Sequence, residues 1–329
     1  MNNIKKIGLS ALAGSLVAIS ANAAELAVSG SMELTYVDTG GDSGNEVTGN
    51  SFGANSGITF TGSGDVGFGT ASFTRAINDT NTGWGSAFQT LDMGDMGTLS
   101  FDSTGGALVG LKANDDTLPT AYEESWTGVS SSGVSGVGSS NVIGYRGTFE
   151  GVSISAGYTK GGTAATGESA SSGAGAHGSI KGVYLSMSPI DGLTVGIGGS
   201  DNSGTSKGPR TTDTTEVQAS VNYAMGPIAV GYRQAEVNNG GTGAAASEIN
   251  GYSIAFNVNE SFAVSYGEQE KKNVAVSSTA AVTEDVTGIS AAYTVGAASV
   301  RLNHSESTND GNVKNAEDEM TEISLALSF

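Results

Sequence analysis

The chain has 329 residues, of which 51 are glycine and four are proline, and it contains no cysteine. Acidic residues outnumber basic ones by 33 to 14, which gives a net charge of −19 at pH 7. This balance argues against nucleic acid as a partner, since phosphate binding needs a basic face, and the lack of cysteine excludes disulfides, thiolate metal sites and a catalytic thiol.

Residues 1–23 have the pattern of a secretory signal peptide. Lys5 and Lys6 form a basic start, an apolar stretch too short to span a bilayer as a helix follows, and Ala21-Asn22-Ala23 is an A-x-A cleavage site. We therefore expect an exported mature chain, residues 24–329, that forms a single domain; cleavage after Ala24 is an alternative. Without the two lysines it has 12 basic and 33 acidic residues, a net charge of −21.

The mature chain is a series of short segments in which apolar and polar residues alternate, as in β-strands with one apolar face. In the last one, Ile323, Leu325, Leu327 and Phe329 share one face, and the other face is mostly small and polar. The expected strands are Leu26–Tyr36, Gly57–Gly62, Val66–Arg75, Gly85–Met93, Thr98–Asp102, Asn141–Phe149, Val152–Thr159, Val183–Met187, Leu193–Ile197, Val217–Tyr223, Ile228–Tyr232, Tyr252–Phe256, Phe262–Tyr266, Ile289–Tyr293, Ala298–Leu302 and Thr321–Phe329.

An even count of about sixteen strands, with roughly nineteen residues per strand and connection, is typical of an all-β transmembrane antiparallel barrel. Lipid would contact one face of each strand and an aqueous lumen the other. Both mature ends fall on the side of the short turns, so the first and last strands can pair and leave no open edge in lipid. Aromatic residues beside the short turns would form an interfacial girdle: Phe149, Tyr223, Phe256, Phe262, Tyr293 and Phe329. The alternative is a soluble sandwich, whose strands also alternate.

In the order and spacing of its strands the mature chain resembles the general porins, the trimeric sixteen-stranded channels of the Gram-negative outer membrane. The segments that carry the resemblance are Leu26–Tyr36, Gly97–Phe101, Asn141–Arg146, Phe149–Tyr158 and the terminal Phe329. The resemblance implies a passive pore for small hydrophilic solutes, assembled as a homotrimer in outer-membrane lipid. It also implies that the barrel-assembly machinery reads the aromatic C-terminal strand at Phe329.

In that family the long third loop folds into the barrel and narrows it, and its acidic residues face basic residues on the wall. Ser103–Ser140 is the longest stretch without clear alternation and occupies the position of this loop. By this resemblance the candidate constriction residues on the loop are Asp115, Asp116, Glu123 and Glu124. The strand register places further charged residues on the lumen face: Glu33, Asp102, Arg146, Arg233, Arg301 and Glu322. Arg75 is a candidate too, but it has the parity of Phe73, so it needs a bulge or a loop position to face the lumen. The Pro-Glu-Phe-Gly-Gly motif of enterobacterial porins is absent.

Other interpretations of these residues remain open. The loop acids could be solvated charge, and the lumen arginines could hold loop and wall together without any effect on selectivity. If the acids line the pore, their excess predicts weak cation selectivity. A substrate-specific channel, with Tyr122 or Trp126 as a stacking platform, is an alternative, as is a surface adhesin or structural barrel whose acidic loops bind a partner or cations.

We expect neither a cofactor nor an enzymatic activity. Asp42–Glu46 and Asp310-Gly311-Asn312 could give oxygen ligands to Ca²⁺, but neither has the full spacing of a site. His177 and His304 are interpreted as ordinary surface residues. His304 and Ser305 are adjacent in a strand and would point to opposite faces, so they cannot form a nucleophile–base pair, and no Walker loop or HExxH motif occurs.

Overall fold

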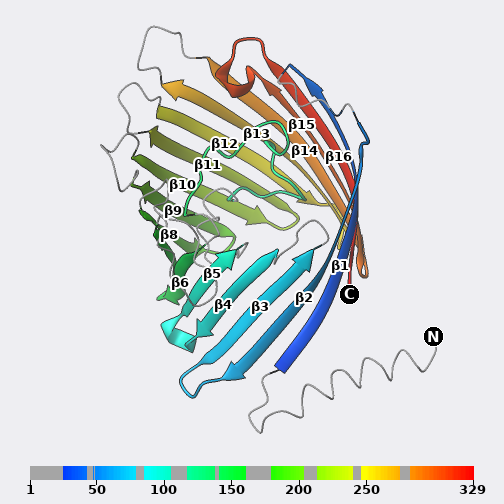
Figure 1. Ribbon diagram of the computed structural model, residues 1–329. Helices are drawn as coiled ribbons and strands as arrows, with labels where there is room; N and C mark the ends of the chain where they lie inside the picture. Colours follow the sequence, from blue (N-terminus) through cyan, green and yellow to red (C-terminus); the bar gives the residue numbers. More distant parts are fainter. Residues whose placement is uncertain are drawn as a thin grey trace, which may run out of the picture.

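The computed structural model describes residues 25–42, 47, 49–78, 85–104, 117–137, 141–160, 179–203, 213–239, 246–274 and 282–329. In these residues sixteen strands form one closed antiparallel barrel, in which each strand pairs with its neighbours in the chain and β1 pairs with β16 (Figure 1). The predicted sixteen-stranded barrel is therefore confirmed. No helix in the described part of the chain is long and apolar enough to cross a membrane.

The strands are unequal in length, so one side of the wall is lower than the other. Strands β3 to β7 have seven to nine residues, whereas β8 to β16 have ten to thirteen. The elements are β1 (Glu25–Gly41), β2 (Phe52–Asp65), β3 (Thr70–Asn78), β4 (Ser86–Asp92), the 3₁₀ turn η1 (Gly94–Met96), β5 (Thr98–Thr104), β6 (Val142–Phe149), β7 (Val152–Lys160), β8 (Ser179–Ile190), β9 (Leu193–Asn202), β10 (Thr214–Met225), β11 (Ile228–Asn239), β12 (Ala246–Asn257), β13 (Phe262–Val274), β14 (Thr283–Val295), β15 (Ala298–Thr308), the 3₁₀ turn η3 (Asp310–Asn312) and β16 (Glu317–Ser328).

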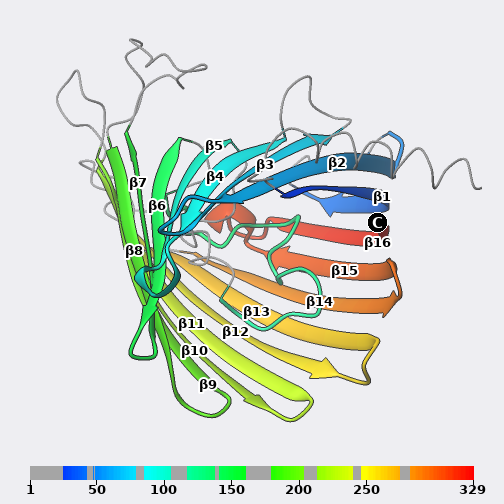
Figure 2. The ribbon, with the colours of Figure 1, turned by 90° about the horizontal axis from the view of Figure 1, so that it is seen from below.

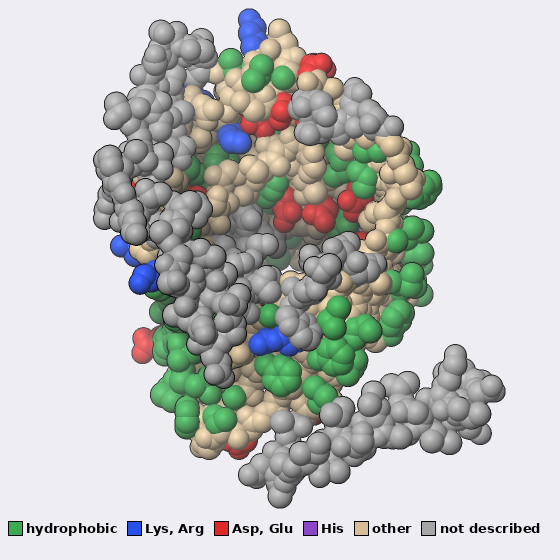
Figure 3. All heavy atoms as spheres, in the orientation of Figure 1, with side chains coloured by type: hydrophobic (Ala, Val, Ile, Leu, Met, Phe, Trp, Pro, Cys, Tyr) green, Lys and Arg blue, Asp and Glu red, His purple; other side chains and the backbone are tan. Residues whose placement is uncertain are grey.

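The two faces of the wall differ as the alternation predicts. On β16, Ile323 and Leu325 are 44% and 40% exposed on the outside, whereas Ser324 between them is 1% exposed and faces inward. Figure 3 shows hydrophobic side chains over the outer flanks of the barrel. An apolar outer face and a polar inner face suit a barrel that has lipid outside and water inside.

The barrel closes between β1 and β16, the first and last strands. Gly30 and Phe329 exchange backbone hydrogen bonds of 2.6 and 2.9 Å, and the β1–β16 ladder continues from Ser31 opposite Ser328 to Gly41 opposite Asp318. The sheet therefore has no open edge at this seam, as a spanning sheet requires.

Several turns and loop bounds differ from the sequence-based prediction. The first turn was expected at Ser63–Asp65, but β2 continues through these residues and the chain reverses at 66–69. There Gly67 has φ +88°, and its N–H donates a 2.6 Å bond to the Asp65 carboxylate. The loop expected from Asp38 is also shorter, because β1 continues to Gly41 and β2 starts at Phe52. Small polar residues therefore continue these strands and do not end them.

Around Pro189 the sequence also predicts too early a turn. The structure extends β8 to Ile190 with an irregular register after Met187, and the reversal is at Asp191-Gly192. The predicted hairpin turn at Glu150-Gly151 is confirmed, with φ of +49° and +82° as a two-residue type I′ turn requires.

Candidate pore constriction

Residues 117–137, which we call the inner loop, belong to the predicted Ser103–Ser140 loop, whose first two residues instead continue β5 to Thr104. They lie inside the ring of strands (Figures 1 and 2). Four hydrogen bonds fix the first arm of the inner loop to the lumen faces of β10, β12, β13 and β14. They join Asn222 Nδ2 to the Thr117 carbonyl at 2.7 Å, Ser253 Oγ to the Pro119 carbonyl at 2.8 Å, the Ala121 N–H to Ser265 Oγ at 2.9 Å and the Tyr122 N–H to Ser290 Oγ at 3.1 Å.

The middle of the inner loop packs directly on the wall. A Cβ atom added to Gly288 of β14 would lie 2.5 Å from the Cα of Ser125, so only glycine permits this approach. Trp126 is 8% exposed and belongs to a small apolar cluster with Val286 and Met320 of the wall. The inner loop therefore has its own buried contact surface inside the barrel.

Arg233 of β11 lies under the return arm of the inner loop and has no exposed surface. Its guanidinium donates to the Ser132 carbonyl at 2.9 Å and to Gln269 Oε1 at 2.6 Å, and it lies 4.7 Å from the centre of the Trp126 ring. Arg233 faces inward as the register predicts, but the inner loop covers it. Its role is to hold the loop to the wall, and Trp126 is too buried to serve as a stacking platform for solutes.

Two wall carboxylates also hold the return arm. Glu216 of β10 accepts bonds from the Ser135 and Gly136 N–H groups at 2.9 and 2.8 Å. Glu284 of β14 accepts a bond from the Ser130 hydroxyl. Sequence reasoning did not identify these two glutamates. Alternation puts both on the lumen face, but it does not say which lumen positions the loop covers.

At the tip of the inner loop, five residues meet in a group that we call the constriction cluster: Glu33, Tyr122, Glu123, Arg301 and Glu322. Arg301 Nη1 is 3.4 Å from Glu33 Oε1, and its guanidinium lies 5.0 Å from the centre of the Tyr122 ring. The Tyr122 hydroxyl donates to Glu322 Oε1 at 2.8 Å. The structure thus brings together three of the wall positions that the register placed in the lumen.

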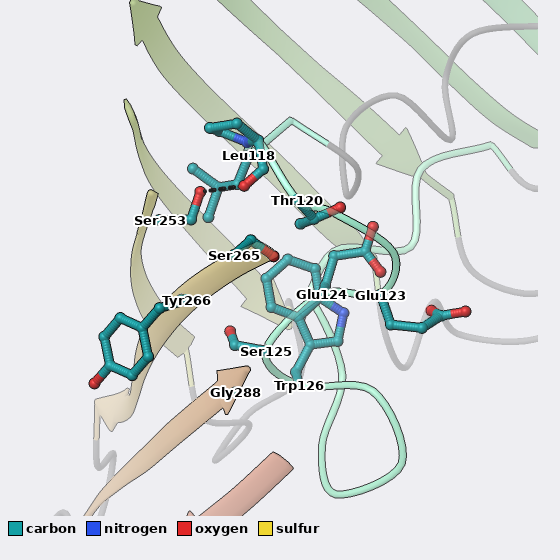
Figure 4. A pocket seen from close by; sticks show the side chains of 12 residues that line it. Leu118, Thr120, Glu123, Glu124, Ser125, Trp126, Ser253, Ser265, Tyr266 and Gly288 are labelled. Atoms are coloured by element: carbon teal, nitrogen blue, oxygen red, sulfur yellow. Dashed lines mark hydrogen bonds between the residues drawn. The ribbon is translucent and has the colours of Figure 1, made fainter. Parts of the chain in front are cut away.

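The acidic residues of the tip point into the lumen. In Figure 4, Glu123 and Glu124 extend away from the wall strands, on the side opposite to Ser253 and Ser265. Figure 3 shows acidic side chains gathered in the opening of the barrel. The constriction cluster together with Glu124 therefore carries four carboxylates and one guanidinium.

Burial changes the titration of two groups on the tip. It raises the pKa of the Glu123 carboxyl, which a 3.2 Å bond from the Thr127 hydroxyl lowers in part and the nearby Glu322 raises again. Burial also raises the pKa of Tyr122 to about 12. The phenol therefore keeps its proton and remains a donor to Glu322 at neutral pH.

The other predicted constriction residues are placed differently. Arg146 is exposed on the lumen face of β6, as the register predicts. Asp102 of β5 lies opposite Val142 and has no exposed surface, so the prediction that it lines the pore is wrong. Asp115 and Asp116 lie outside the described residues.

The prediction that Arg75 lines the pore is wrong as well. Regular pairing puts Arg75 of β3 opposite Phe60 and Ala87, on the outer face of the wall. The one irregularity nearby falls on β4, between Ala87 and Phe88, and does not turn Arg75 inward. Its guanidinium donates to the carbonyls of Thr74 and Phe88, at 2.8 and 3.3 Å.

The predicted cation loops are described only in part. Within the described residues no group of three or more histidine or acidic side chains is placed to hold a metal. In η3 the Asn312 amide nitrogen donates to the carbonyls of Lys271 and Val282, at 2.8 and 2.9 Å. Of the segment Asp42–Glu46 only Asp42 is described.

His304 does not face the lumen. His304 lies on the outer face of β15 with Nδ1 2.8 Å from Thr321 Oγ1, whereas Ser305 is fully buried on the inner face. The two side chains point to opposite faces, as predicted. His177 lies outside the described residues.

Comparison with known proteins places this barrel in a family. The sequence profile of the Gram-negative porins matches residues 8–326, and the chain therefore belongs to that family of outer-membrane channels for small solutes. No curated protein matches the chain.

Solved porin structures share the fold at low sequence identity. The anion-selective porin from Comamonas acidovorans is 15% identical, with a TM-score of 0.65 over 93% of this chain and 100% of its own. OmpF of Salmonella typhi, solved with daunomycin, is 12% identical, with a TM-score of 0.66 over 94% and 99%. A loop-deletion variant of OmpT from Vibrio cholerae is 14% identical, with a TM-score of 0.67 over 93% and 99%.

Proposed function

We propose that the protein is a general diffusion porin with a weak preference for cations. The observation that carries this proposal is the constriction cluster, in which Glu33, Glu123 and Glu322 surround a single cation, Arg301. Rings of acidic side chains at the narrow part of a pore favour cations over anions. An anion-selective porin shares this fold, so the charges in the lumen, and not the barrel itself, decide the preference.

Transport through such a pore involves no chemistry. The polar inner face keeps the lumen wet, and the inner loop, held by Arg233, Glu216 and Glu284, reduces the open cross-section. Arg301 is itself held by Glu33 and Tyr122, so it remains at a fixed place in the constriction. Solute size is limited by the loop, and ion preference follows from the excess of carboxylates at its tip.

We extend the proposal to a homotrimer, which the low side of the wall supports. Strands β4 and β5 have seven residues each. At about 3.3 Å per residue and a tilt of about 35–45°, seven residues rise only about 16–19 Å, which is less than the apolar band of about 25 Å. Ala87 and Gln89, which face outward here, are small or polar. This sector suits contact with another protomer better than contact with lipid, and one OmpT structure is described as a trimer form.

Export and assembly complete the proposal. We propose that the signal peptide is removed after Ala23 and that the mature chain, residues 24–329, is delivered to the outer membrane. The terminal strand β16 is proposed as the element that the barrel-assembly machinery recognises, together with Phe329, which directly follows it and is 73% exposed.

The test is the single-channel current of the refolded mature protein in a planar bilayer under a KCl gradient. Insertion in steps of three, an ohmic current and a reversal potential that favours potassium are expected. A reversal potential that favours chloride would refute cation preference. Current steps too small for an open, water-filled lumen, together with complete block by one specific solute, would favour a substrate-specific channel. A folded, heat-modifiable barrel that does not conduct would refute the pore and favour an adhesin.

A further inference from the structure

A separate cavity of about 370 Å³, which we call the vestibule cavity, lies between the return arm of the inner loop and the wall. We propose that the vestibule cavity binds neutral polyhydroxylated solutes, that is sugars or polyols. The inference rests on the proposed channel function, because a solute must enter the lumen to reach the cavity.

The vestibule cavity lies between the constriction cluster and the long-loop end of the barrel. Its wall residues include Asn202 at the end of β9, Thr214 at the start of β10 and Ser247 near the start of β12. These are the strand ends opposite to the two-residue turns at 191–192 and 226–227. Solutes that enter from the side of the long loops therefore meet the cavity before the constriction cluster.

The lining of the cavity matches hydroxyl groups. Side-chain hydroxyls and an amide dominate it. The Ser200 and Ser247 hydroxyls already donate to Glu216 and Asn273, at 2.7 and 2.8 Å, so their oxygens remain as acceptors for the hydroxyl groups of a sugar. The polar residues that carry this argument are Ser131, Ser135, Ser200, Asn202, Thr214 and Ser247. The volume falls in the range of about 300–1,000 Å³ that is usual for sites of small molecules.

The two charged residues of the lining favour a neutral ligand. Glu216 already accepts the Ser135 and Gly136 N–H groups and, at 2.7 Å, the Ser200 hydroxyl. Lys271 lies 3.6 Å from Glu284, which is 1% exposed. An anionic solute near Lys271 would also meet these two carboxylates. A hydroxyl of a neutral solute would accept a hydrogen bond from the ammonium group without that repulsion.

The cavity is also held in shape before any solute binds. Gly133 turns the return arm with φ +74°, and a Cβ atom there would lie 2.3 Å from Ile249 Cδ1. The neighbouring Ser132 carbonyl is fixed by Arg233, and the Ser132 hydroxyl bonds to the Val134 carbonyl at 2.9 Å. A fixed site loses little conformational entropy when it binds, which partly offsets the lack of an aromatic platform.

Weak binding at this position would change transport in a measurable way. A site that solutes enter and leave readily raises their concentration next to the constriction and fills at high concentration. The flux of a bound solute therefore saturates, whereas the flux of a solute that does not bind rises in proportion to its concentration.

The experiment measures the ion current of single channels of the mature protein while sorbitol or gluconate is added on one side. These probes have the same six-carbon polyol chain and differ in the carboxylate of gluconate. We expect sorbitol to reduce the current with saturation in the millimolar range and gluconate to reduce it without saturation. A polyethylene glycol of similar mass serves as the control for viscosity.

A double variant, Asn202→Leu with Thr214→Val, removes two polar groups of the lining. We expect its half-saturating sorbitol concentration to rise about tenfold, as for the loss of two hydrogen bonds. The matched control is Thr35→Val on the lumen face of β1, outside the cavity, which should leave the value unchanged. Heat-modifiability on gels verifies that each variant folds.

The outcomes separate this inference from the proposed function. A normal ion current that sorbitol reduces without saturation, or saturation by gluconate alone, overturns the vestibule site and leaves the porin proposal intact. The comparison of sorbitol with gluconate on the native protein decides this even if the double variant does not fold. A folded barrel without ion current overturns both.

Discussion

The long strands β10 to β16, here called the high wall, and the short strands β3 to β5, the low wall, belong to one continuous sheet. They differ in which of their two faces is unusual. On the high wall the inner loop lies against the inner face, where polar residues that bond to it, such as Gln218, Ser265 and Ser290, are buried. On the low wall it is the outer face that departs from the usual pattern, because it carries Arg75. The comparison shows that strand parity decides which face a residue occupies, whereas the covering element decides what the residue does there.

The largest expected effect comes from breaking the contact between the high wall and the inner loop. Arg233→Ala removes two hydrogen bonds from a charged donor, so we expect a loss of about 3–5 kcal/mol in the free energy of unfolding and a larger, noisier single-channel current. Urea unfolding in liposomes and planar-bilayer recording measure the two effects. The control is Arg146→Ala, at an exposed position on the lumen face of β6; the inner loop packs on this strand at Val142, through Val137. Equal stabilities of the two variants would contradict the proposal that Arg233 holds the inner loop to the wall.

The next effect concerns the outer face of the low wall. An arginine that faces lipid costs about 2–4 kcal/mol at the bilayer centre, so Arg75→Leu would stabilise the barrel if lipid surrounded it. If another protomer covers this sector, the same change removes a polar contact and lowers the temperature at which the trimer dissociates on semi-native gels. Lys181→Leu, on the outer face of β8, is the control. A more stable barrel with an unchanged trimer would refute the interface.

The face of the wall that each of these side chains occupies can be predicted from the sequence. Parity alone predicts that Ile323 faces out and Ser324 in, and that Glu33 and Arg301 share the lumen, because the period of a strand is two and the barrel is regular. Parity also predicts that Arg75, like Phe73, faces outward. The family resemblance nevertheless favours Arg75 as a constriction residue, and the regular ladder contradicts this prediction.

Which lumen-facing residues are covered by other parts of the chain could not be predicted from the sequence. Arg233 and Asp102 have lumen parity but no exposed surface, and Glu216 holds the loop although no local pattern marks it. These roles depend on contacts between the inner loop and strands more than 80 residues away, such as Ser135 with Glu216 and Ser132 with Arg233. Alternation within one strand carries no information about such contacts.

In the constriction cluster, two substitutions should change ion preference in opposite directions. Glu322→Gln keeps the acceptor for Tyr122 but removes a charge, so the preference for potassium should fall; Arg301→Gln should raise it. One charge at about 4 Å in water is worth about 1 kcal/mol, which sets an upper limit of about fivefold on the permeability ratio. Reversal potentials under a KCl gradient measure both. Glu306→Gln, on the outer face of β15, is the control. Equal shifts of the reversal potential in all three variants would refute the role of the constriction cluster in ion preference.

A smaller effect should follow from pH. Because burial raises the pKa of Glu123, this carboxyl takes up its proton at a higher pH than an exposed glutamate does. As the pH falls from neutral, the preference for potassium should therefore decrease in two stages, the first from Glu123. Reversal potentials between pH 7 and pH 4 should show the first stage in the native protein and not in Glu123→Gln. A single stage in both proteins would contradict the assignment.

The smallest effect is expected at the outer ion pair of β8 and β9. Lys181 and Asp201 are 3.2 Å apart, but their side chains are 66% and 43% exposed. Exposed pairs of this kind contribute about 0–1 kcal/mol, so Lys181→Ala should leave urea unfolding within that range of the native protein. A larger loss would indicate that this part of the outer face has a partner.

The most direct test of the inner loop as the element that narrows the pore is the single-channel conductance after its removal. Residues 117–137 are replaced by a short Gly/Ser linker, and folding is verified by heat-modifiability. We expect a clearly larger ohmic conductance and a weaker preference for potassium, since the loop and Glu123 are both gone. A folded barrel with the conductance and reversal potential of the native protein would show that the constriction lies elsewhere.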